Sequence, residues 1–301
     1  MRIAITGSTG LIGSALTEYF EKAGHSVTPI LRKSSGPRAK KSGIFWDISK
    51  GEIDVPGLEG HDVVINLAGA TIARRWTKSY KEELYLSRVN SAGLLAHWIT
   101  KLRRPPRVLL SASAVGFYGN NPAHKNVEES TAMGGGFLAN LCHSWEMAAK
   151  PVERNGVRLL HMRFGMVLSE HGGALAKMLP IFKLGLGGRI GSGRQVISWI
   201  YLNEIPIIIL YLIDSTSISG AVNFVAPEPV TNYLFTKTLG QILDRPTVVP
   251  LPAFAARMMF GEMADELLLS GAKVLPRRLQ ENGYQFKYPM LESALRASLL
   301  L

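Results

Sequence analysis

A run of regularly spaced glycines near the start of the chain constrains the fold more than any other feature. Gly7, Gly10 and Gly13 directly follow an apolar stretch at residues 3–5, and a helical pattern runs from there to Gly24. Glycines three apart let the chain turn tightly after a strand and present bare backbone N–H groups to a pyrophosphate at the positive end of the next helix. The strand before and the helix after favour a dinucleotide-binding turn over a plain strand-to-helix turn. The predicted contacts are Gly7, Thr9, Gly10, Leu11, Ile12 and Gly13.

Strand-like and helix-like segments alternate through the first half of the chain. The hydrophobic periodicity predicts strands at residues 2–6, 26–31, 43–46, 62–67, 107–112 and 157–163, and helices at residues 11–23, 78–101 and 138–154. This alternation is typical of βαβ units, and continuous apolar runs such as residues 63–65 suit strands covered on both faces. We therefore predict an α/β fold, a Rossmann-type doubly wound parallel sheet with a smaller C-terminal substrate subdomain.

The pattern of residue types along the sequence changes after about residue 168. Glycine-rich loops, such as residues 185–193, and a region with several prolines replace the regular alternation. We expect a cofactor-binding domain over residues 1–168 and a mainly substrate-binding part over residues 169–301. Late elements at about residues 199–225 are expected to return to the sheet.

The composition is that of an ordinary globular enzyme, because 47% of the 301 residues are hydrophobic. The single cysteine, Cys142, excludes an intramolecular disulfide and a cysteine-rich metal site, and it suits a reducing compartment. No basic-then-apolar leader precedes the first strand, and the longest apolar run, residues 205–213, is too short to cross a bilayer. We expect a cytoplasmic protein with no bound metal and no membrane partner.

The strong positive charge does not by itself indicate nucleic acid. The formal net charge is +11 and the pI is near 9.8, but the basic residues occur in scattered pairs at residues 74–75, 103–104 and 277–278. No basic stripe with interleaved aromatic residues is present. A basic balance also suits a protein that holds a phosphate-rich cofactor. We expect a small-molecule substrate and no nucleic acid partner.

The ends of three predicted strands carry further candidate contacts to the cofactor. Arg32 and Lys33 stand where an NAD-binding fold usually has an acidic residue, so they favour a 2′-phosphate and hence NADP, unless they are two solvated cations. Asp47 either accepts from the adenine amino group or begins a turn. Small residues after the fourth strand, in the segment that contains Leu67, Ala68 and Gly69, allow close approach of the backbone to the cofactor.

Several segments together resemble one branch of a known superfamily. The glycine turn, the strand end at residues 66–69 and the loop at residues 111–119 resemble the extended short-chain dehydrogenases/reductases. The segments at residues 74–77, 190–195, 199–200, 274–279 and 283–286 look like an atypical branch of epimerase-family, NADP-dependent oxidoreductases. The resemblance covers essentially the whole chain. It implies NADP contacts at Arg32, Lys33, Leu67, Ala68, Glu83, Arg88 and Val167, and it implies a homodimer through the two long helices.

The usual acid/base pair of the superfamily is missing from this chain. Ordinary members carry Tyr-x-x-x-Lys on the helix after the serine loop, where the lysine lowers the pKa of the phenol. Aligning Glu146 with the acidic residue that follows that lysine puts Leu138 at the tyrosine position and Cys142 at the lysine position. The candidate catalytic residues are then Ser113 and Tyr118.

Each substitute for the missing pair has a structural alternative. Ser113 can hold a substrate oxygen or only satisfy backbone groups, and Tyr118 can face the nicotinamide or pack under its loop. Cys142 can turn toward the pocket or be a small buried apolar residue. His143 can turn toward the pocket or face the solvent. After residue 200 the branch usually has His and then Asp residues, whereas this chain has Tyr201 and Glu204, which places the substrate specificity in question.

Two functional hypotheses follow from the sequence. The first is an NADP(H)-dependent oxidoreductase or epimerase-like enzyme that acts on a small polar, sugar-derived substrate by hydride transfer. The second is a non-catalytic NADP(H)-binding protein that reports cofactor state to a partner, which the missing tyrosine and lysine favour.

Overall fold

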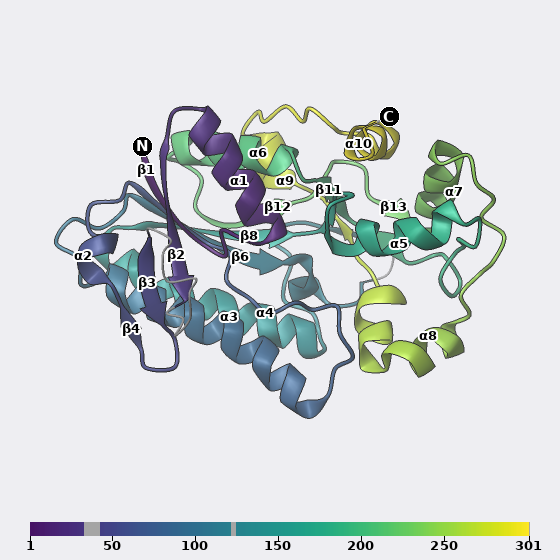
Figure 1. Cartoon of the computed structure of the whole chain (residues 1–301), viewed down its shortest axis with the longest axis horizontal. Helices are drawn as coiled ribbons and strands as arrows, with labels where there is room; N and C mark the ends of the chain where they lie inside the picture. Colours follow the sequence, from purple (N-terminus) through teal and green to yellow (C-terminus); the bar gives the residue numbers. More distant parts are fainter. Residues whose placement is uncertain (33–42, 122–124, 301) are drawn as a thin grey trace.

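An eight-stranded sheet forms the centre of the molecule in the computed structural model, which describes residues 1–32, 43–121 and 125–300 (Figure 1). The strand order is β12-β8-β6-β5-β1-β2-β3-β4, and all neighbours are parallel except the edge pair β3 and β4. The strands span Arg2–Thr6 (β1), Ser26–Arg32 (β2), Ile44–Asp47 (β3), Glu52–Ile53 (β4), Val63–Asn66 (β5), Val108–Ala114 (β6), Arg158–Phe164 (β8) and Gly220–Phe224 (β12).

Helices cover both faces of this sheet (Figure 1). Helices α1 (Leu11–Lys22) and α6 (Glu204–Asp214) pack on one face, where they share an apolar core with Ile3, Ile5 and their neighbours. Helices α3 (Lys78–Ile99) and α4 (Phe137–Ala149) pack on the other face against Ala4 and the alternate residues of the strands. The predicted Rossmann-type doubly wound α/β fold is therefore confirmed.

Short helices and small two-stranded sheets complete the molecule. The pairs are β7 (Asn126–Val127) with β14 (Lys273–Val274), β9 (Met166–Leu168) with β11 (Trp199–Tyr201), and β10 (Val196–Ile197) with β13 (Val230–Thr231). The further helices are α2 (Val55–Leu58), α5 (Gly173–Lys183), α7 (Asn232–Ile242), α8 (Ala253–Phe260), α9 (Arg277–Glu281) and α10 (Leu291–Ser298). Two 3₁₀ helices, η2 (Val115–Tyr118) and η3 (Lys150–Asn155), and a π-helical turn, η4 (Ala264–Leu268), join them. The boundary placed at residue 168 stays a prediction.

The helix expected at residues 138–154 is shorter in the structure. The α-helix ends at Ala149 and continues as the 3₁₀ helix η3, which begins with Lys150 and Pro151. Proline has no backbone N–H, and its ring collides with the carbonyl four residues earlier in an α-helix. The apolar run at residues 205–213 lies within the buried helix α6. Among the described residues, no helix is both long and apolar enough to cross a membrane.

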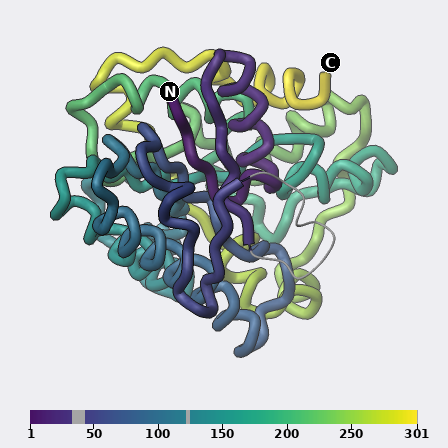
Figure 2. Tube along the Cα trace, turned by 60° about the vertical axis from the view of Figure 1, so that its left-hand side comes forward, coloured from purple at the N-terminus to yellow at the C-terminus, as the bar shows by residue number. Residues whose placement is uncertain are grey.

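One buried carboxylate fastens the C-terminal segment to the sheet side that carries α1 and α6 (Figures 1 and 2). Glu204 accepts hydrogen bonds from the Tyr284 hydroxyl at 2.6 Å and from the backbone N–H groups of Lys287 and Tyr288 at 3.1 and 2.9 Å. Tyr201 donates its hydroxyl proton to the carbonyl of Ala297 at 3.2 Å. The two positions that depart from the atypical branch thus contact the chain's own C-terminal segment.

Candidate functional site

The glycine turn has no room for side chains. Gly7 has φ +66°, and a Cβ atom there would lie 2.8 Å from the carbonyl oxygen of Leu67. A Cβ atom on Gly13 would lie 2.1 Å from the carbonyl oxygen of Gly7. Helix α1 begins with Gly10 at its N-cap, and no side chain caps it. The first-turn N–H groups are therefore left to an anion or to solvent.

A single hydroxyl group holds the strand ends beside this turn. Thr6 Oγ1 donates to Asn66 Oδ1 at 2.7 Å and accepts from the N–H groups of Leu67 and Ala68 at 2.9 and 3.1 Å. The Asn66 side-chain amide donates in turn to Ser111 Oγ at 3.4 Å. This ladder crosses β1, β5 and β6 and fixes the Leu67 backbone against the glycines. No hydrogen-bonding role was predicted for Thr6, Asn66 and Ser111 from the sequence, although polar residues near the ends of buried strands are a readable signal.

Arg88 lies at the same edge of the sheet. Its two terminal nitrogens donate to the carbonyl oxygens of Leu84 and Ala70 at 3.2 and 3.0 Å. The guanidinium lies 5.3 Å from the ring centre of Trp145 and within 3.4 Å of a Cβ built on Gly69. Burial lowers the pKa of Arg88. Among the described residues it joins no ion pair, so an anionic ligand would satisfy a charge that the protein leaves unbalanced.

The candidate contacts on the other side of β1 lie at the ends of β2 and β3. Arg32 is the exposed last residue of β2, and Lys33 lies outside the described residues. Asp47 Oδ1 accepts from Ser49 N and Oγ at 3.0 and 2.6 Å and from Lys50 N at 3.2 Å. These hydrogen bonds lower the pKa of Asp47, and the bond from the Ser49 hydroxyl has the largest effect. Asp47 therefore begins a turn, which is one of the two roles expected for it. Its contact with adenine stays a prediction.

Val167 and Glu83 occupy different settings. Val167 lies half-buried in β9, and its carbonyl oxygen is 3.5 Å from a Cβ built on Gly173. A methyl group of Leu11 lies 3.5 Å from the same point, so β9 and the start of α5 adjoin the glycine turn. Glu83 is exposed on α3. The structure thus brings Val167 to the turn and leaves Glu83 on the exposed surface of α3, five residues before Arg88.

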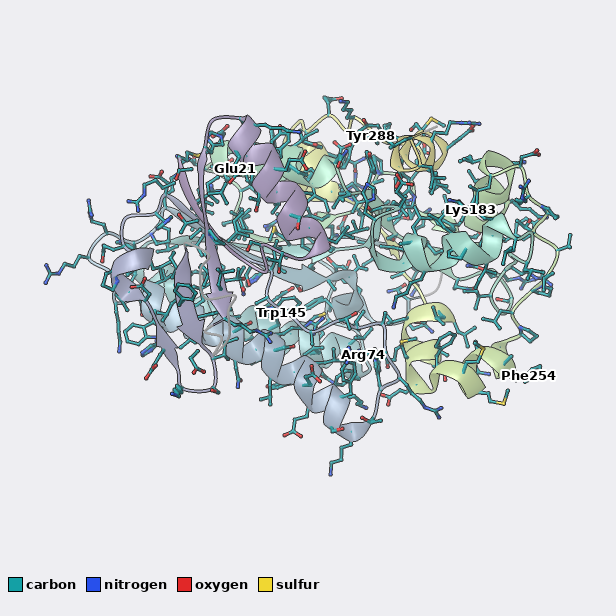
Figure 3. All side chains as sticks on the ribbon, in the orientation of Figure 1. Glu21, Arg74, Trp145, Lys183, Phe254 and Tyr288 are labelled. Carbon is teal, nitrogen blue, oxygen red and sulfur yellow. The ribbon has the colours of Figure 1, made fainter. Side chains whose placement is uncertain are left out.

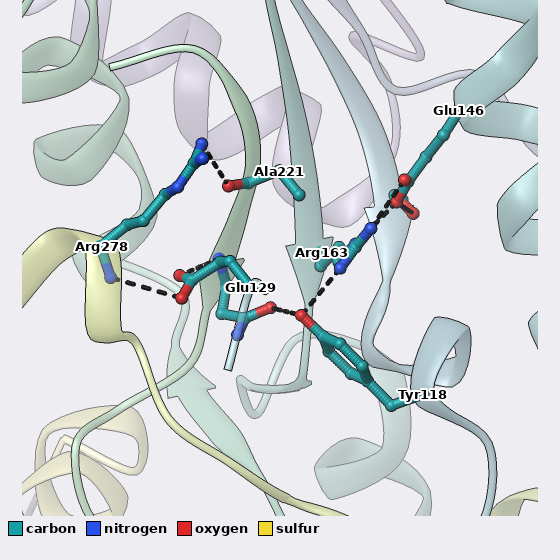
Figure 4. Close-up of polar contacts among 8 residues, drawn as sticks. Tyr118, Glu129, Glu146, Arg163, Ala221 and Arg278 are labelled. Atoms are coloured by element: carbon teal, nitrogen blue, oxygen red, sulfur yellow. Dashed lines mark hydrogen bonds and ion pairs between the residues drawn. The ribbon is translucent and has the colours of Figure 1, made fainter. Parts of the chain in front are cut away.

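Ser113 and Tyr118 belong to one buried hydrogen-bond network (Figure 4). The Ser113 hydroxyl donates to Glu146 Oε1 at 2.7 Å, and Arg163 donates to both Glu146 oxygens at 2.8 and 2.9 Å. Arg163 also donates to the Tyr118 hydroxyl at 2.8 Å, and that hydroxyl donates to Asn223 Oδ1 at 2.7 Å. Ser113 and Tyr118 are each 2% exposed. Their catalytic role stays a prediction, and both hydroxyl protons are already engaged.

The charges in this network are set by burial and by the ion pair. Burial alone would raise the pKa of Glu146, but the Arg163 guanidinium outweighs it and the pKa is lowered. The guanidinium also lies 3.5 Å from the centre of the Phe117 ring. Burial raises the pKa of Tyr118 to about 12. At neutral pH the network therefore contains a carboxylate, a guanidinium and a neutral phenol.

The network continues into the C-terminal part of the chain (Figure 4). Glu129 accepts from the backbone N–H of Asn223 at 2.9 Å and from that of Arg278 at 3.3 Å. The Arg278 side chain donates to the carbonyl oxygen of Ala221 at 3.1 Å. The edge strand β12 and the helix α9 are thus tied to the same buried ion pair that holds Ser113.

The positions of the missing acid/base pair are filled by packing. A Cβ atom on Gly116 would lie 3.2 Å from Leu138 Cβ and 3.7 Å from Cys142 Sγ. Leu138 and Cys142 are both buried, and burial raises the pKa of the Cys142 thiol to about 12. His143 is exposed. Cys142 is thus a neutral, buried thiol, and His143 is the solvent-facing residue of the two alternatives.

Tyr118 should make the protein less stable at high pH. The neutral phenol is favoured in the folded state, so the stabilisation is complete below pH 10, where an unfolded tyrosine titrates, and is lost as the pH rises toward 12. At about pH 11 the free energy of unfolding should be lower by about 1 kcal/mol from this group. Urea unfolding of wild type and Tyr118→Phe at neutral and alkaline pH measures it. An equally steep decline in the variant would contradict a buried neutral phenol.

Comparisons with known proteins agree with this geometry. A family model described as the NAD dependent epimerase/dehydratase family matches residues 3–223, and a domain of unknown function (DUF1731) matches residues 251–298. The epimerase family protein Mb2239 of Mycobacterium bovis is 42% identical over 294 residues, which cover 97% of this chain and 96% of that protein.

Two solved structures are similar over almost the entire chain. The crystal structure of human epimerase family protein SDR39U1 with NADPH is 36% identical, covers 100% of both chains and has a TM-score of 0.91. A nucleoside-diphosphate sugar epimerase from Corynebacterium glutamicum is 34% identical with a TM-score of 0.79, covering 99% of this chain and 58% of that one.

Proposed function

The chain belongs to the NAD dependent epimerase/dehydratase family, and we propose that it binds NADP(H) at the carboxyl edge of its sheet and acts as an oxidoreductase or epimerase-like enzyme. The observation that carries this proposal is the close approach of Gly7 to the Leu67 backbone, beside the start of α1, which no side chain caps among the described residues. The human relative was solved with NADPH, which supports the choice of cofactor. The Corynebacterium relative is named a nucleoside-diphosphate sugar epimerase, which supports a small polar, sugar-derived substrate.

The residues at this edge fit such a cofactor. The N–H groups at the start of α1 would bind the pyrophosphate, and the small residues Ala68 and Gly69 would let the backbone approach it. Arg88 would place its charge beside the phosphates, and Arg32 with Lys33 would hold the 2′-phosphate of the adenosine. When bound, the cofactor supplies hydride transfer. Further proposed contacts are made by Thr9, Ile12, Asp47, Glu83 and Val167.

Ser113 would serve as an acceptor at this site. Its proton is donated to Glu146, which the Arg163 guanidinium keeps ionised. The serine oxygen therefore has lone pairs to offer, but no proton for a substrate carbonyl. The Tyr118 hydroxyl likewise donates its hydrogen bond to Asn223 Oδ1 and keeps its proton. This arrangement suits holding a substrate hydroxyl in place better than protonating a carbonyl.

Discrimination between NADPH and NADH tests the proposed cofactor site. Wild type should bind NADPH more tightly than NADH. Arg32→Ala should lower the affinity for NADPH by about ten-fold or more, because a charge-assisted hydrogen bond is lost, and should leave the affinity for NADH unchanged. Arg103→Ala is the matched control, since Arg103 lies just before β6, at the opposite end of the parallel strands. Calorimetric titration measures both. Equal wild-type affinity for the two cofactors would refute the 2′-phosphate assignment.

A non-catalytic NADP(H)-binding protein is the second candidate, and the packed apolar residues Leu138 and Cys142 favour it. Incubation with a panel of carbonyl compounds in the presence of NADPH, and of nucleotide sugars in the presence of NADP+, separates the candidates. The enzyme should reduce a carbonyl compound with oxidation of NADPH, or oxidise or epimerise a nucleotide sugar with NADP+, and Ser113→Ala should slow that turnover without changing NADPH affinity. Tight NADPH binding with no turnover across the panel would favour the non-catalytic candidate.

A further inference from the structure

Helix α8 carries its large apolar side chains on the outside. Of its eight residues only Ala256 is buried, whereas Phe254 and Met258 are each 71% exposed. These two residues are four apart and so lie on one face of the helix. Figure 3 shows Phe254 at the outer edge of the molecule. The usual pattern of a surface helix, with large apolar residues inward, is reversed here, and such exposure marks a contact surface.

The exposed apolar surface extends along the neighbouring chain segments. Val248 and Leu184 are 72% and 73% exposed. The segments that carry them run side by side, since Val249 N donates to the carbonyl of Gly187 at 3.4 Å and Leu251 N to that of Arg189 at 2.9 Å. Figure 1 shows the chain descending along this side of the molecule from α7 to α8. We call Leu184, Leu186, Val248, Val249, Phe254 and Met258 the apolar edge.

The exposed charges around the apolar edge are mostly positive. Four exposed cations lie in the same two segments and the adjoining turn: Lys183, Arg189, Arg194 and Arg245. Within the part of the chain that the structure describes, none of the four forms an ion pair. Asp244 is the exposed acid beside Arg245.

The one cation of α8 is already paired. Arg257 of α8 is neutralised by Asp265, with Nε 2.9 Å from Oδ1. Arg245 Nε donates to the carbonyl oxygen of Lys183 at 3.0 Å, which keeps these two cations close together. Among the described residues, the four exposed cations thus outnumber Asp244 along these segments, and no ion pair neutralises them.

We propose that the apolar edge docks on the surface of an anionic lipid bilayer. Protruding Phe, Met, Val and Leu side chains would enter the interface between headgroups, and the flanking cations would meet the anionic lipids. A second copy of the chain is a poorer occupant, because pairing this edge with itself would bring the four cations against their own copies. The contact is peripheral and concerns no spanning helix. It revises the expectation of no membrane partner and does not depend on the cofactor.

Co-sedimentation of the full chain with lipid vesicles tests this proposal. The protein should pellet with phosphatidylcholine vesicles that contain phosphatidylglycerol, and should bind pure phosphatidylcholine about ten-fold more weakly. The double variant Phe254→Ser/Met258→Ser should lower binding to the anionic vesicles by about ten-fold or more. Arg189→Gln/Arg245→Gln should remove most of the preference for anionic lipid.

Matched controls keep the test decisive. Met147→Ser removes an exposed apolar side chain of α4, on another part of the surface, and should bind vesicles as wild type does. Phe254→Ser/Met258→Ser and Met147→Ser should keep the wild-type thermal midpoint, because the changed side chains are exposed. Equal sedimentation with both vesicle types, or unchanged binding by Phe254→Ser/Met258→Ser, would overturn the proposal. A wild-type dimer that this variant converts to monomers in analytical ultracentrifugation, without vesicle binding, would assign the edge to a second copy instead.

Discussion

The close approach of β1 and β5 just after Thr6 and Asn66 is the constraint on which the proposed cofactor site depends. The carbonyl of Leu67 occupies the space where any side chain at Gly7 would begin, and the Thr6 hydroxyl ties the two strand ends together. On one side of β1 the sheet continues through β2 and β3, and on the other through β5, β6 and β8. In open α/β sheets, ligands bind outside the carboxyl ends of the strands where the connections change direction in this way, and α1 begins at that end of β1.

A second constraint, the ion pair of Glu146 and Arg163, holds the buried network that contains Ser113 and Tyr118. Breaking a buried ion pair leaves an uncompensated charge, so each partner requires the other. Through Ser113, Tyr118 and Asn223 the pair joins β6, α4, β8, η2 and β12. Helix α4 is thus positioned by a structural ion pair, although the tyrosine and lysine that usually make it catalytic are replaced.

The sequence predicted the regular part of this molecule well. The strands at residues 2–6 and 26–31 and the glycine turn were readable because their signals are local: apolar runs, turn residues and helix starts. The family resemblance is confirmed by the comparisons. The break of α4 was also local, at Pro151, but the periodicity around it concealed it. The two-residue strand β4 is too short to give a period.

The buried network could not be read from the sequence because its members are far apart along the chain. Tyr118 and Asn223 are separated by 105 residues, and Ser113 and Glu146 by 33. Each alone is an ordinary polar residue, and only the folded sheet brings them together. The role of Glu204 was hidden for the same reason, because its partners at Tyr284, Lys287 and Tyr288 lie 80 or more residues away. The apolar edge was hidden because exposure is a property of the fold.

We propose that the tight glycine turn binds NADP(H), and the NADPH affinity of a Gly13→Ala variant tests this most directly. The added methyl group would lie 2.1 Å from the Gly7 carbonyl oxygen, whereas a Cβ on Gly135 meets nothing within 4 Å. Calorimetric titration of folded Gly13→Ala should show an NADPH affinity lower by about ten-fold or more, with Gly135→Ala equal to wild type. Wild-type affinity in Gly13→Ala would contradict the account.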